Sequence, residues 1–185
     1  QKDQASNFYN NFTGRAVDIR PMFDDEGNSM SAYVINGASR YGPTDKTLLL
    51  IDDLNDARRN TFLRLYSDGA VHIPYVAGES TYKGAVLNKF LGIVDVDGSR
   101  KDYNNVPLYR YADVLLMLAE AKNNLNLDPS SEINAVRQRA YGANYNDTYK
   151  YTNNTQTANT KAILDERMKE FIGEGKRWWD LVRAG

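Results

Sequence analysis

The distribution of apolar and polar positions changes near residue 106. Beyond it, apolar residues recur at helical spacing, which predicts a helix from about Val106 to Asn124 with Pro107 in its first turn. The break NLDPSS supplies a polar cap and a proline for a second helix, SEINAVRQRAYG, that ends at Gly142. Because the link between them is so short, the two helices must pack antiparallel.

A third helix is predicted to begin at Asn159 or Thr160. Its apolar stripe consists of Ile163, Leu164, Met168, Phe171 and Ile172. Gly173 and Gly175 are expected to interrupt it, which leaves a further helix with Trp178, Trp179 and Leu181.

The first hundred residues lack long helical periodicity and are broken by Gly, Pro, Asn and Asp. TFLRLYSDGAVHIPYV predicts two short strands around an Asp68-Gly69 turn. KTLLLIDDLNDARRNTF is compatible with a strand or a helix, and we favour a helix that ends near Asn55. Residues 76–106 are expected to be irregular or edge-strand structure.

These elements predict a mainly α fold, in which tetratricopeptide-like helix pairs (residues 106–185) pack on an irregular, loop-rich segment (residues 1–105) with a short β-hairpin. Small residues at the expected helix crossings support the helical-repeat architecture: Ala112, Ala119, Ala121 and Ala135. One helix pair cannot bury the first helix on all sides. We therefore expect the first hundred residues, or a further segment, to cover it.

Composition excludes several functional classes. The 185 residues suffice for one full core or two small ones, and 23 basic residues nearly balance 24 acidic ones, so the charge expected of a nucleic-acid binder is missing. The absence of cysteine removes disulfides and thiol chemistry, and one histidine, His72, leaves little room for zinc. No stretch approaches the roughly 18 apolar residues of a membrane span, and QKDQASNFYNNFTG is too polar for a signal peptide. The chain is thus either cytoplasmic or part of a longer protein.

Two acids stand out on the apolar first helix. Asp113 and Glu120 are seven positions apart, so they share a face about 10 Å apart along the axis. They are candidates for a catalytic pair, a metal site or an ion-pair network. The nearby guanidinium groups favour a network, since a buried carboxylate needs such a partner; they belong to Arg110, Arg137, Arg139 and Arg167. Burial by neighbouring helices would leave no glycosidase cleft, and two acids two turns apart cannot share an ion.

Other candidate chemistry is weaker. The 13 tyrosines and many asparagines fall partly in loops such as YGANYNDTYKYTNNTQTANT, which suits either a sugar-binding surface or a solvated polar loop. DVDGSRKD at 95–102 begins like a calcium loop but lacks the closing Glu, so we favour a plain turn, with no metal predicted. His72 is interpreted as a strand histidine rather than a catalytic one.

Three segments together resemble the C-terminal half of the SusD/RagB family of nutrient-binding outer-membrane lipoproteins: VPLYRYADVLLMLAEAKNNL, EINAVRQRA and AILDERMKEFIGEGKRWWDLVRAG. The upstream YGPTDK and DDLNDARRNTF, with Asp56 and Arg58, resemble the family's Asp-x-Arg segment. The resemblance covers about residues 41–185. Members are usually far longer, begin with a lipobox cysteine and continue past LVRAG, so we expect this chain to be a fragment of one SusD-like domain.

The resemblance implies a surface-exposed lipoprotein of Bacteroidetes-type bacteria that binds glycans or other nutrients for uptake, without catalysis or cofactor. It also implies a SusC-like TonB-dependent transporter as partner and a lipid anchor in the missing N-terminal part. The family's motifs do not fix ligand contacts. Candidate ligand-binding residues are therefore tyrosines with polar neighbours: Tyr33, Asn36, Arg40, Tyr41, Tyr75 and Tyr82, followed by Tyr145 and Tyr149. We interpret Trp178 and Trp179 as packing between repeats.

Glycan binding is the leading interpretation. The alternatives are a helical-repeat scaffold that binds a protein and, third, a glycoside hydrolase that uses paired carboxylates.

Overall fold

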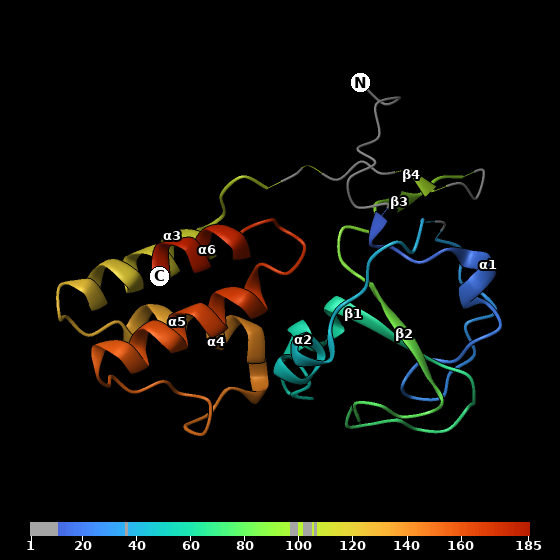
Figure 1. Cartoon of the computed structure of the whole chain (residues 1–185), viewed down its shortest axis with the longest axis horizontal. Helices are drawn as coiled ribbons and strands as arrows, with labels where there is room; N and C mark the ends of the chain where they lie inside the picture. The colour runs from blue at the N-terminus through green and yellow to red at the C-terminus, as the bar shows by residue number, and fades with distance from the viewer. Residues whose placement is uncertain (1–10, 36, 97–99, 102–104, 106) are drawn as a thin grey trace. The chain divides into compact units, whose positions relative to one another are not determined.

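The computed structural model describes residues 11–35, 37–96, 100–101, 105 and 107–185 (Figure 1). Residues 1–54 and 59–105 form one compact unit, here called the first unit. Residues 55–58 and 106–185 form the second, here called the helical unit. The candidate calcium turn at 95–102, Asn36 and Val106 lie wholly or partly outside the described residues.

The described part of the helical unit contains four α-helices, α3 to α6, which lie side by side in Figure 1. Helix α3 (Tyr111–Asn124) packs against α4 (Ser130–Tyr141) and α5 (Gln156–Glu170), and α5 packs against α6 (Arg177–Ala184). A short 3-10 helix, η3 (Gly142–Asn144), follows α4. The mainly α, tetratricopeptide-like fold predicted from the pattern is confirmed.

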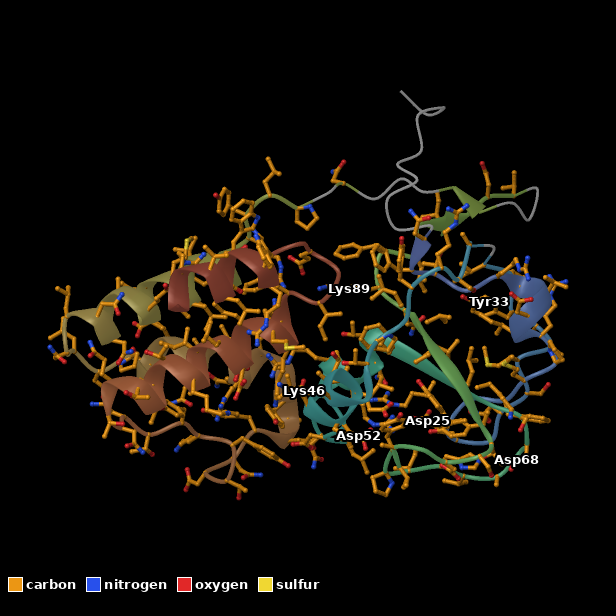
Figure 2. All side chains as sticks on the ribbon, viewed as in Figure 1. Asp25, Tyr33, Lys46, Asp52, Asp68 and Lys89 are labelled. Carbon is orange, nitrogen blue, oxygen red and sulfur yellow. The ribbon has the colours of Figure 1, made fainter. Side chains whose placement is uncertain are left out.

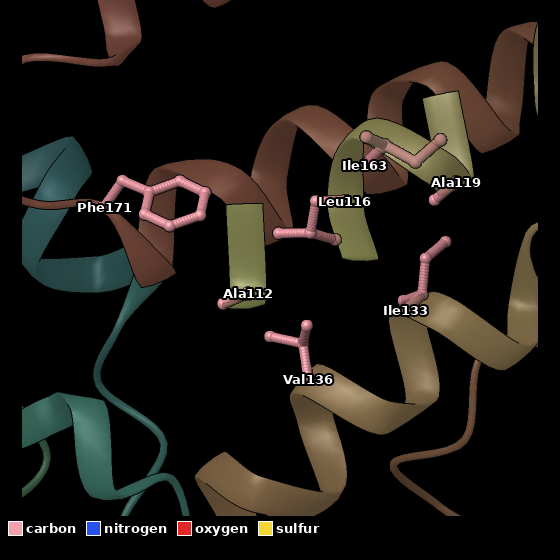
Figure 3. Packing of buried hydrophobic residues seen from close by; sticks show 7 residues of the cluster. All are labelled: Ala112, Leu116, Ala119, Ile133, Val136, Ile163 and Phe171. Carbon is pink, nitrogen blue, oxygen red and sulfur yellow. The ribbon is translucent and has the colours of Figure 1, made fainter. Parts of the chain in front are cut away.

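One apolar cluster fills the space between α3, α4 and α5 (Figure 3). It consists of Ala112, Leu116, Ala119, Ile133, Val136, Ile163 and Phe171. Three of these recur on α3 at steps of four and three residues, which places them on one face. Two of those three are alanines, whose small side chains let the helix backbones approach closely. Among the described helices, none combines the length and apolar character of a membrane span.

Two of the predicted helix starts are wrong. Helix α3 begins at Tyr111 rather than near residue 106, because the backbone of Arg110 is extended (φ −145°, ψ 165°). Helix α5 begins at Gln156, three to four residues before the prediction. Its cap is Thr155, whose side chain accepts a hydrogen bond from the amide of Ala158, whereas Asn159 is buried inside the helix.

The predicted helix ends are confirmed. Helix α4 ends at Tyr141, and Gly142 caps it with a positive φ of 52°, a conformation that favours glycine. Helix α5 ends before Gly173 and Gly175, and α6 then carries both tryptophans.

The first unit contains α1 (Ala16–Ile19), α2 (Asp45–Leu50) and two short sheets. Strand β1 (Phe62–Tyr66) pairs antiparallel with β2 (Tyr82–Leu87), in the register Phe62↔Leu87 to Leu65↔Gly84. Strand β3 (Ile93–Val94) pairs with β4 (Arg100–Lys101). A further 3-10 helix, η2, spans Ala57–Thr61. The core of this unit consists of Ile19, Leu65 and Val86, against which Met22, Met30, Tyr33 and Leu63 pack.

The predicted hairpin at Asp68-Gly69 is wrong, although an antiparallel strand pair exists. The partner of β1 is β2, and residues 67–81 form a longer connection. Asp68 accepts hydrogen bonds from the amide of Ala70 and from the ring of His72. Those bonds fold the segment back locally, so His72 is not a strand residue as predicted.

The predicted helix near residue 50 exists but ends at Leu50 instead of Asn55. Asp52, two residues later, receives hydrogen bonds from the side chain of Arg59 and the amide of Tyr75. The helix therefore ends just before Asp52, whose carboxylate binds these two groups inside the first unit.

Candidate functional site

Asp113 lies buried in an ion-pair cluster between α3, α5 and α6. Arg167 Nη2 donates to Asp113 Oδ1 at 3.2 Å, and Arg167 Nε donates to Asp180 Oδ1 at 2.8 Å. Lys176 Nζ lies 3.1 Å from Asp113 Oδ2. The side chains of Asp113, Arg167 and Asp180 are at most 4% exposed. Two cations therefore meet the Asp113 carboxylate, as a buried acid requires.

Glu120, two turns further along α3, is in a different environment. Both of its carboxylate oxygens accept hydrogen bonds from Arg183 at 3.2 Å, and the two side chains are 33% and 44% exposed. Arg183 also donates to Asp180 at 2.9 Å. Glu120 and Arg183 border a cavity of about 250 Å³ between α3, α5 and α6. The two acids of α3 thus have separate partners and do not form a carboxylate pair.

A second charge cluster lies at the C-terminal end of α5. Glu166 accepts from Arg58 at 2.7 Å and from Arg137 at 2.8 Å. Glu170 accepts from Arg110 and Arg139, and more weakly from Arg58 at 3.4 Å. These guanidinium groups surround acids whose side chains are at most 2% exposed.

Two further acids complete this second cluster. Glu174 accepts from Arg110 Nε at 2.9 Å, and Asp56 accepts from Arg58 at 2.7 and 2.8 Å. Burial alone would raise the pKa of Glu170, but the hydrogen bond from Arg110, with the charges of Arg110 and Arg139, holds it below the usual range. The Glu170 carboxylate therefore stays ionised near neutral pH, which disfavours a role for it in proton transfer.

All six residues predicted to form a structural network are in ion pairs, although in two clusters: Arg110, Asp113, Glu120, Arg137, Arg139 and Arg167. Sequence reasoning missed the other members: Asp56, Arg58, Glu166, Glu170, Glu174, Lys176, Asp180 and Arg183. One signal could have found two of them. Glu166 and Glu170 are four residues apart on α5, so they share the helix face that meets the arginines.

The first unit contains a cavity of about 410 Å³ that combines aromatic, apolar and polar groups, and we call it the tyrosine cleft. This volume is within the range of about 300–1,000 Å³ common for small-ligand sites. Its aromatic walls are Tyr41 and Tyr82. Its apolar lining includes Ile19, Met22, Leu65 and Val86, and its polar groups include Asp18, Ser39, Asp45 and Lys83.

The structure brings two of the six predicted ligand-binding residues together in this cleft. Tyr41 is 63% exposed, and Tyr82 lies on β2. Tyr75 is only 3% exposed and lies behind the cleft, where its ring meets that of Tyr82 edge-on at 5.2 Å. Tyr33 packs against the core of the first unit, and Arg40 is exposed but does not line the cleft.

The polar groups of the cleft differ in how far they are already paired. Asp18 forms two hydrogen bonds with Arg15, at 2.7 and 2.8 Å. Lys83 Nζ donates to the carbonyl of Ser80 at 3.0 Å. Asp45 Oδ1 accepts from the hydroxyl of Tyr75 at 2.7 Å. Sequence reasoning missed Asp45, because only the fold brings the start of α2 beside β2.

His72 holds the connection between β1 and β2 to the underlying sheet. Its Nε2 lies 2.6 Å from Asp68 Oδ1 and its Nδ1 2.7 Å from Glu79 Oε1, so both nitrogens face carboxylates and must both carry protons to donate. The hydrogen bond to Asp68 raises the pKa of His72, as does that to Glu79, while burial opposes them. The ring also stacks on Tyr66 at 3.9 Å, and Tyr66 in turn meets Tyr82 edge-on.

The first unit also contains a buried charge cluster, of which Figure 2 labels Asp25 and Asp52. Arg59 contacts Asp25 at 2.6 Å and Asp52 at 3.1 Å, and Arg64 contacts Asp52 at 3.2 Å. Burial lowers the pKa of Arg64, and the charge of Arg59 lowers it further. Asp52 also accepts from the amide of Tyr75 at 2.6 Å, which fixes the backbone of that tyrosine.

The remaining aromatic candidates lie in the helical unit. Tyr149 stacks on Tyr141 at 3.9 Å, and its hydroxyl accepts from Asn55 at 2.8 Å, so it is a packed tyrosine rather than a solvated one. Trp178 and Trp179 were expected to pack between repeats, but within this chain they are 69% and 63% exposed on α6. Within the described part of the chain, no three His, Cys, Asp or Glu side chains are grouped as metal ligands.

The chain also matches known proteins in sequence. A sequence profile of the SusD family matches residues 9–185. A SusD-like protein from Formosa agariphila is 38% identical over 175 residues, or 89% of this chain and 31% of that protein. The starch-binding protein SusD from Bacteroides thetaiotaomicron is 36% identical over 81 residues, or 44% of this chain and 13% of that protein.

A solved structure agrees with the sequence matches. The crystal structure of a SusD superfamily protein from Bacteroides fragilis superposes with a TM-score of 0.83 at 30% identity, over 98% of this chain and 38% of that one. The chain therefore spans less than a third of the length of the two curated relatives above and about two fifths of this solved one.

Proposed function

Because the chain belongs to the SusD family, we propose that it is part of a non-catalytic protein that binds a glycan, or another nutrient, at the outer-membrane surface. The single observation that carries this proposal is the family match over residues 9–185. The starch-binding function of one relative supports a saccharide as the ligand class.

The tyrosine cleft is the proposed binding site within this chain. Sugar rings present apolar C–H faces that stack on aromatic rings, and their hydroxyls need fixed donors and acceptors. Tyr41 and Tyr82 offer the rings, while Ser39, Asp45 and Lys83 offer the polar groups. Binding at this site requires no group to change its protonation state.

Binding calorimetry with neutral oligosaccharides tests the proposal. We expect saturable binding that weakens about 5- to 150-fold in Tyr41→Ala and in Tyr82→Ala, since loss of an aromatic ring that stacks on a ligand ring costs about 1–3 kcal/mol. Tyr109→Ala, which removes an exposed tyrosine of the helical unit, is the matched control and should bind as the wild type does. Unchanged affinity in both cleft variants would remove the cleft from the proposal.

Catalysis is not part of the proposal. The acids that sequence offered as a carboxylate pair, Asp113 and Glu120, are occupied by Arg167, Lys176 and Arg183. Incubation of the protein with the oligosaccharides that it binds should release no reducing ends. Turnover would favour the glycoside hydrolase alternative.

Delivery to a SusC-like TonB-dependent transporter, from a lipoprotein with its lipid anchor outside residues 1–185, completes the proposal. Exposed apolar side chains on the helical unit favour a protein partner of some kind, and with it the alternative of a helical-repeat scaffold. They include Tyr111, Val114 and Leu118 on α3, and Trp178, Trp179 and Val182 on α6.

Co-purification with a tagged SusC-like transporter tests this part. A stable complex that also binds oligosaccharide supports delivery. A complex without any saccharide binding supports the scaffold.

A further inference from the structure

Asp45 differs from Asp18, the other acid of the tyrosine cleft, because no cation is paired with it among the described residues. Asp18 is neutralised by Arg15. Asp45 is exposed at the start of α2, and its Oδ1 accepts a hydrogen bond from an uncharged donor, the hydroxyl of Tyr75. This hydrogen bond uses one carboxylate oxygen, so the second is available to a ligand in the cleft.

Tyr75 is held so that its hydroxyl has a fixed direction. Its side chain is 3% exposed, its amide donates to Asp52 at 2.6 Å, and its ring meets Tyr82 edge-on. Asp52 is fixed in turn by Arg59 and Arg64. Burial raises the pKa of the Tyr75 hydroxyl, and the bond to Asp45 raises it further, so the group remains a neutral donor over the physiological range.

One buried residue therefore touches two groups that line the cleft: it hydrogen-bonds the Asp45 carboxylate and supports the Tyr82 ring. A carboxylate held in one orientation, close to a fixed aromatic face, suits a ligand that presents a hydroxyl next to an apolar ring face.

We propose that Asp45 is the specificity-determining acceptor of the tyrosine cleft, that Tyr75 is its positioning residue, and that the cleft selects neutral saccharides over acidic ones. The inference rests on the proposed function, because it concerns the ligand class of the same site. A uronic-acid carboxylate beside Asp45 would meet a like charge, whereas a neutral hydroxyl would donate to it. The cation that lines the cleft, Lys83, is on β2 and donates to the carbonyl of Ser80 at 3.0 Å rather than to Asp45.

Calorimetry with two probe sets tests the inference: neutral oligosaccharides (maltoheptaose, cellohexaose and xylohexaose) and oligogalacturonates of similar length. The wild type should bind at least one neutral probe more tightly than the oligogalacturonates. Asp45→Asn should weaken neutral binding about 10- to 100-fold, the value of a hydrogen bond to a charged group, and should narrow the preference over the acidic probe. Asp147→Asn, which alters a surface acid of the helical unit, is the matched control and should change neither.

The positioning role requires a second readout. Tyr75→Phe removes only the hydroxyl and should weaken neutral binding by less than Asp45→Asn does. In the double variant D45N/Y75F the losses should not add, because Tyr75 acts through Asp45. Tyr149→Phe, which also removes a hydrogen-bonded tyrosine hydroxyl, is the control for loss of packing.

The outcomes separate the two levels of the proposal. If the wild type binds a neutral probe but Asp45→Asn leaves both affinity and preference unchanged, the inference is overturned and the proposed function stands. Additive losses in the double variant would overturn the positioning role of Tyr75. If no saccharide binds the wild type at all, the proposed function fails and the inference fails with it.

Discussion

Replacing Arg167 by methionine is the sharpest test of the buried charge clusters. The Arg167 side chain is 4% exposed and bridges Asp113 and Asp180, whose side chains are 2% and 1% exposed. Methionine keeps much of the apolar stem of Arg167, but it removes the guanidinium, whose Cζ lies 4.9 Å from the centre of the Phe171 ring, and leaves both carboxylates without their shared partner. Breaking a buried ion pair by removing one member typically costs about 3–5 kcal/mol.

The cations that remain in the Arg167→Met variant determine where in that range the loss of unfolding free energy should fall. Lys176 still reaches Asp113, and Arg183 still reaches Asp180, but their side chains are 16% and 44% exposed and give weaker, better solvated pairs. We therefore expect a loss near the lower end, about 3 kcal/mol. With a urea m-value of about 2 kcal/mol/M, the unfolding midpoint should fall by about 1.5 M.

Far-UV circular dichroism is the appropriate probe, since the long helices α3, α4 and α5 all belong to the helical unit. Lys161→Ala is the matched control: it removes a cation from the same helix, paired with Asp165 at 2.5 Å, but its side chain is 79% exposed. Its midpoint should stay close to that of the wild type. An equally small change in Arg167→Met would refute the reasoning, because it would mean that the two acids are solvated or protonated at no cost.

A triple variant separates the two causes of instability. In R167M/D113L/D180L no uncompensated carboxylate remains, and apolar side chains replace the charges. Replacement of a buried ion cluster by apolar residues is often neutral or stabilising. We expect the triple variant to recover most of the midpoint lost in Arg167→Met. A further fall would show that packing, rather than stranded charge, sets the cost.

Three further predictions concern single side chains. His72, the only histidine, should titrate above about 6.5 in an NMR titration. Because its pKa is raised in the folded state, the stability that it contributes is complete below the unfolded-state pKa and is lost as pH rises through the folded-state pKa. A His72→Gln variant should lose this pH dependence of the free energy of unfolding in urea. Asn123→Leu should lower urea stability by about 2–3 kcal/mol, since the buried Asn123 amide bonds the Gln156 carbonyl, the Thr160 hydroxyl and the Asn159 side chain, and a loss below 1 kcal/mol would indicate that water replaces it. Thr155→Ala should cost about 1 kcal/mol and speed hydrogen exchange at the Ala158 amide, whereas unchanged exchange there would contradict the cap.

The fold could be predicted where periodicity was long and punctuated by glycine. The ends of α4 and α5 followed from Gly142 and Gly173, whose positive φ stops a helix wherever it occurs. The start of α5 could not be predicted, because several Asn and Thr residues in a row are all plausible caps. Only burial distinguishes them, and burial of Asn159 depends on Asn123 of another helix.

The strand pairing failed for a related reason. Asp68-Gly69 is a strong local turn signal, yet the carboxylate of Asp68 is held by His72, and β1 finds its partner further along the chain. The local preference of Asp68-Gly69 for a hairpin turn was therefore overridden by the contact between Asp68 and His72, which no sequence motif indicates. The same applies to the cleft, whose Asp45 and Tyr82 are far apart in sequence and share one buried neighbour, Tyr75.

The residues that carry the family resemblance are largely those of the two charge clusters. RYADVLLMLAEA contains Arg110, Asp113 and Glu120, and ILDER contains Glu166 and Arg167. In the helical unit, a cation is paired with each of these acids. The two sequence motifs therefore consist largely of residues that hold α3, α5 and α6 together. Asp45, in contrast, lies in the irregular first unit and has no paired cation among the described residues. A substitution at Asp45 would leave both charge clusters intact, so under our proposal for Asp45 the same helical unit is compatible with different ligands. This is why the motif identifies the family from sequence alone but does not identify what the protein binds.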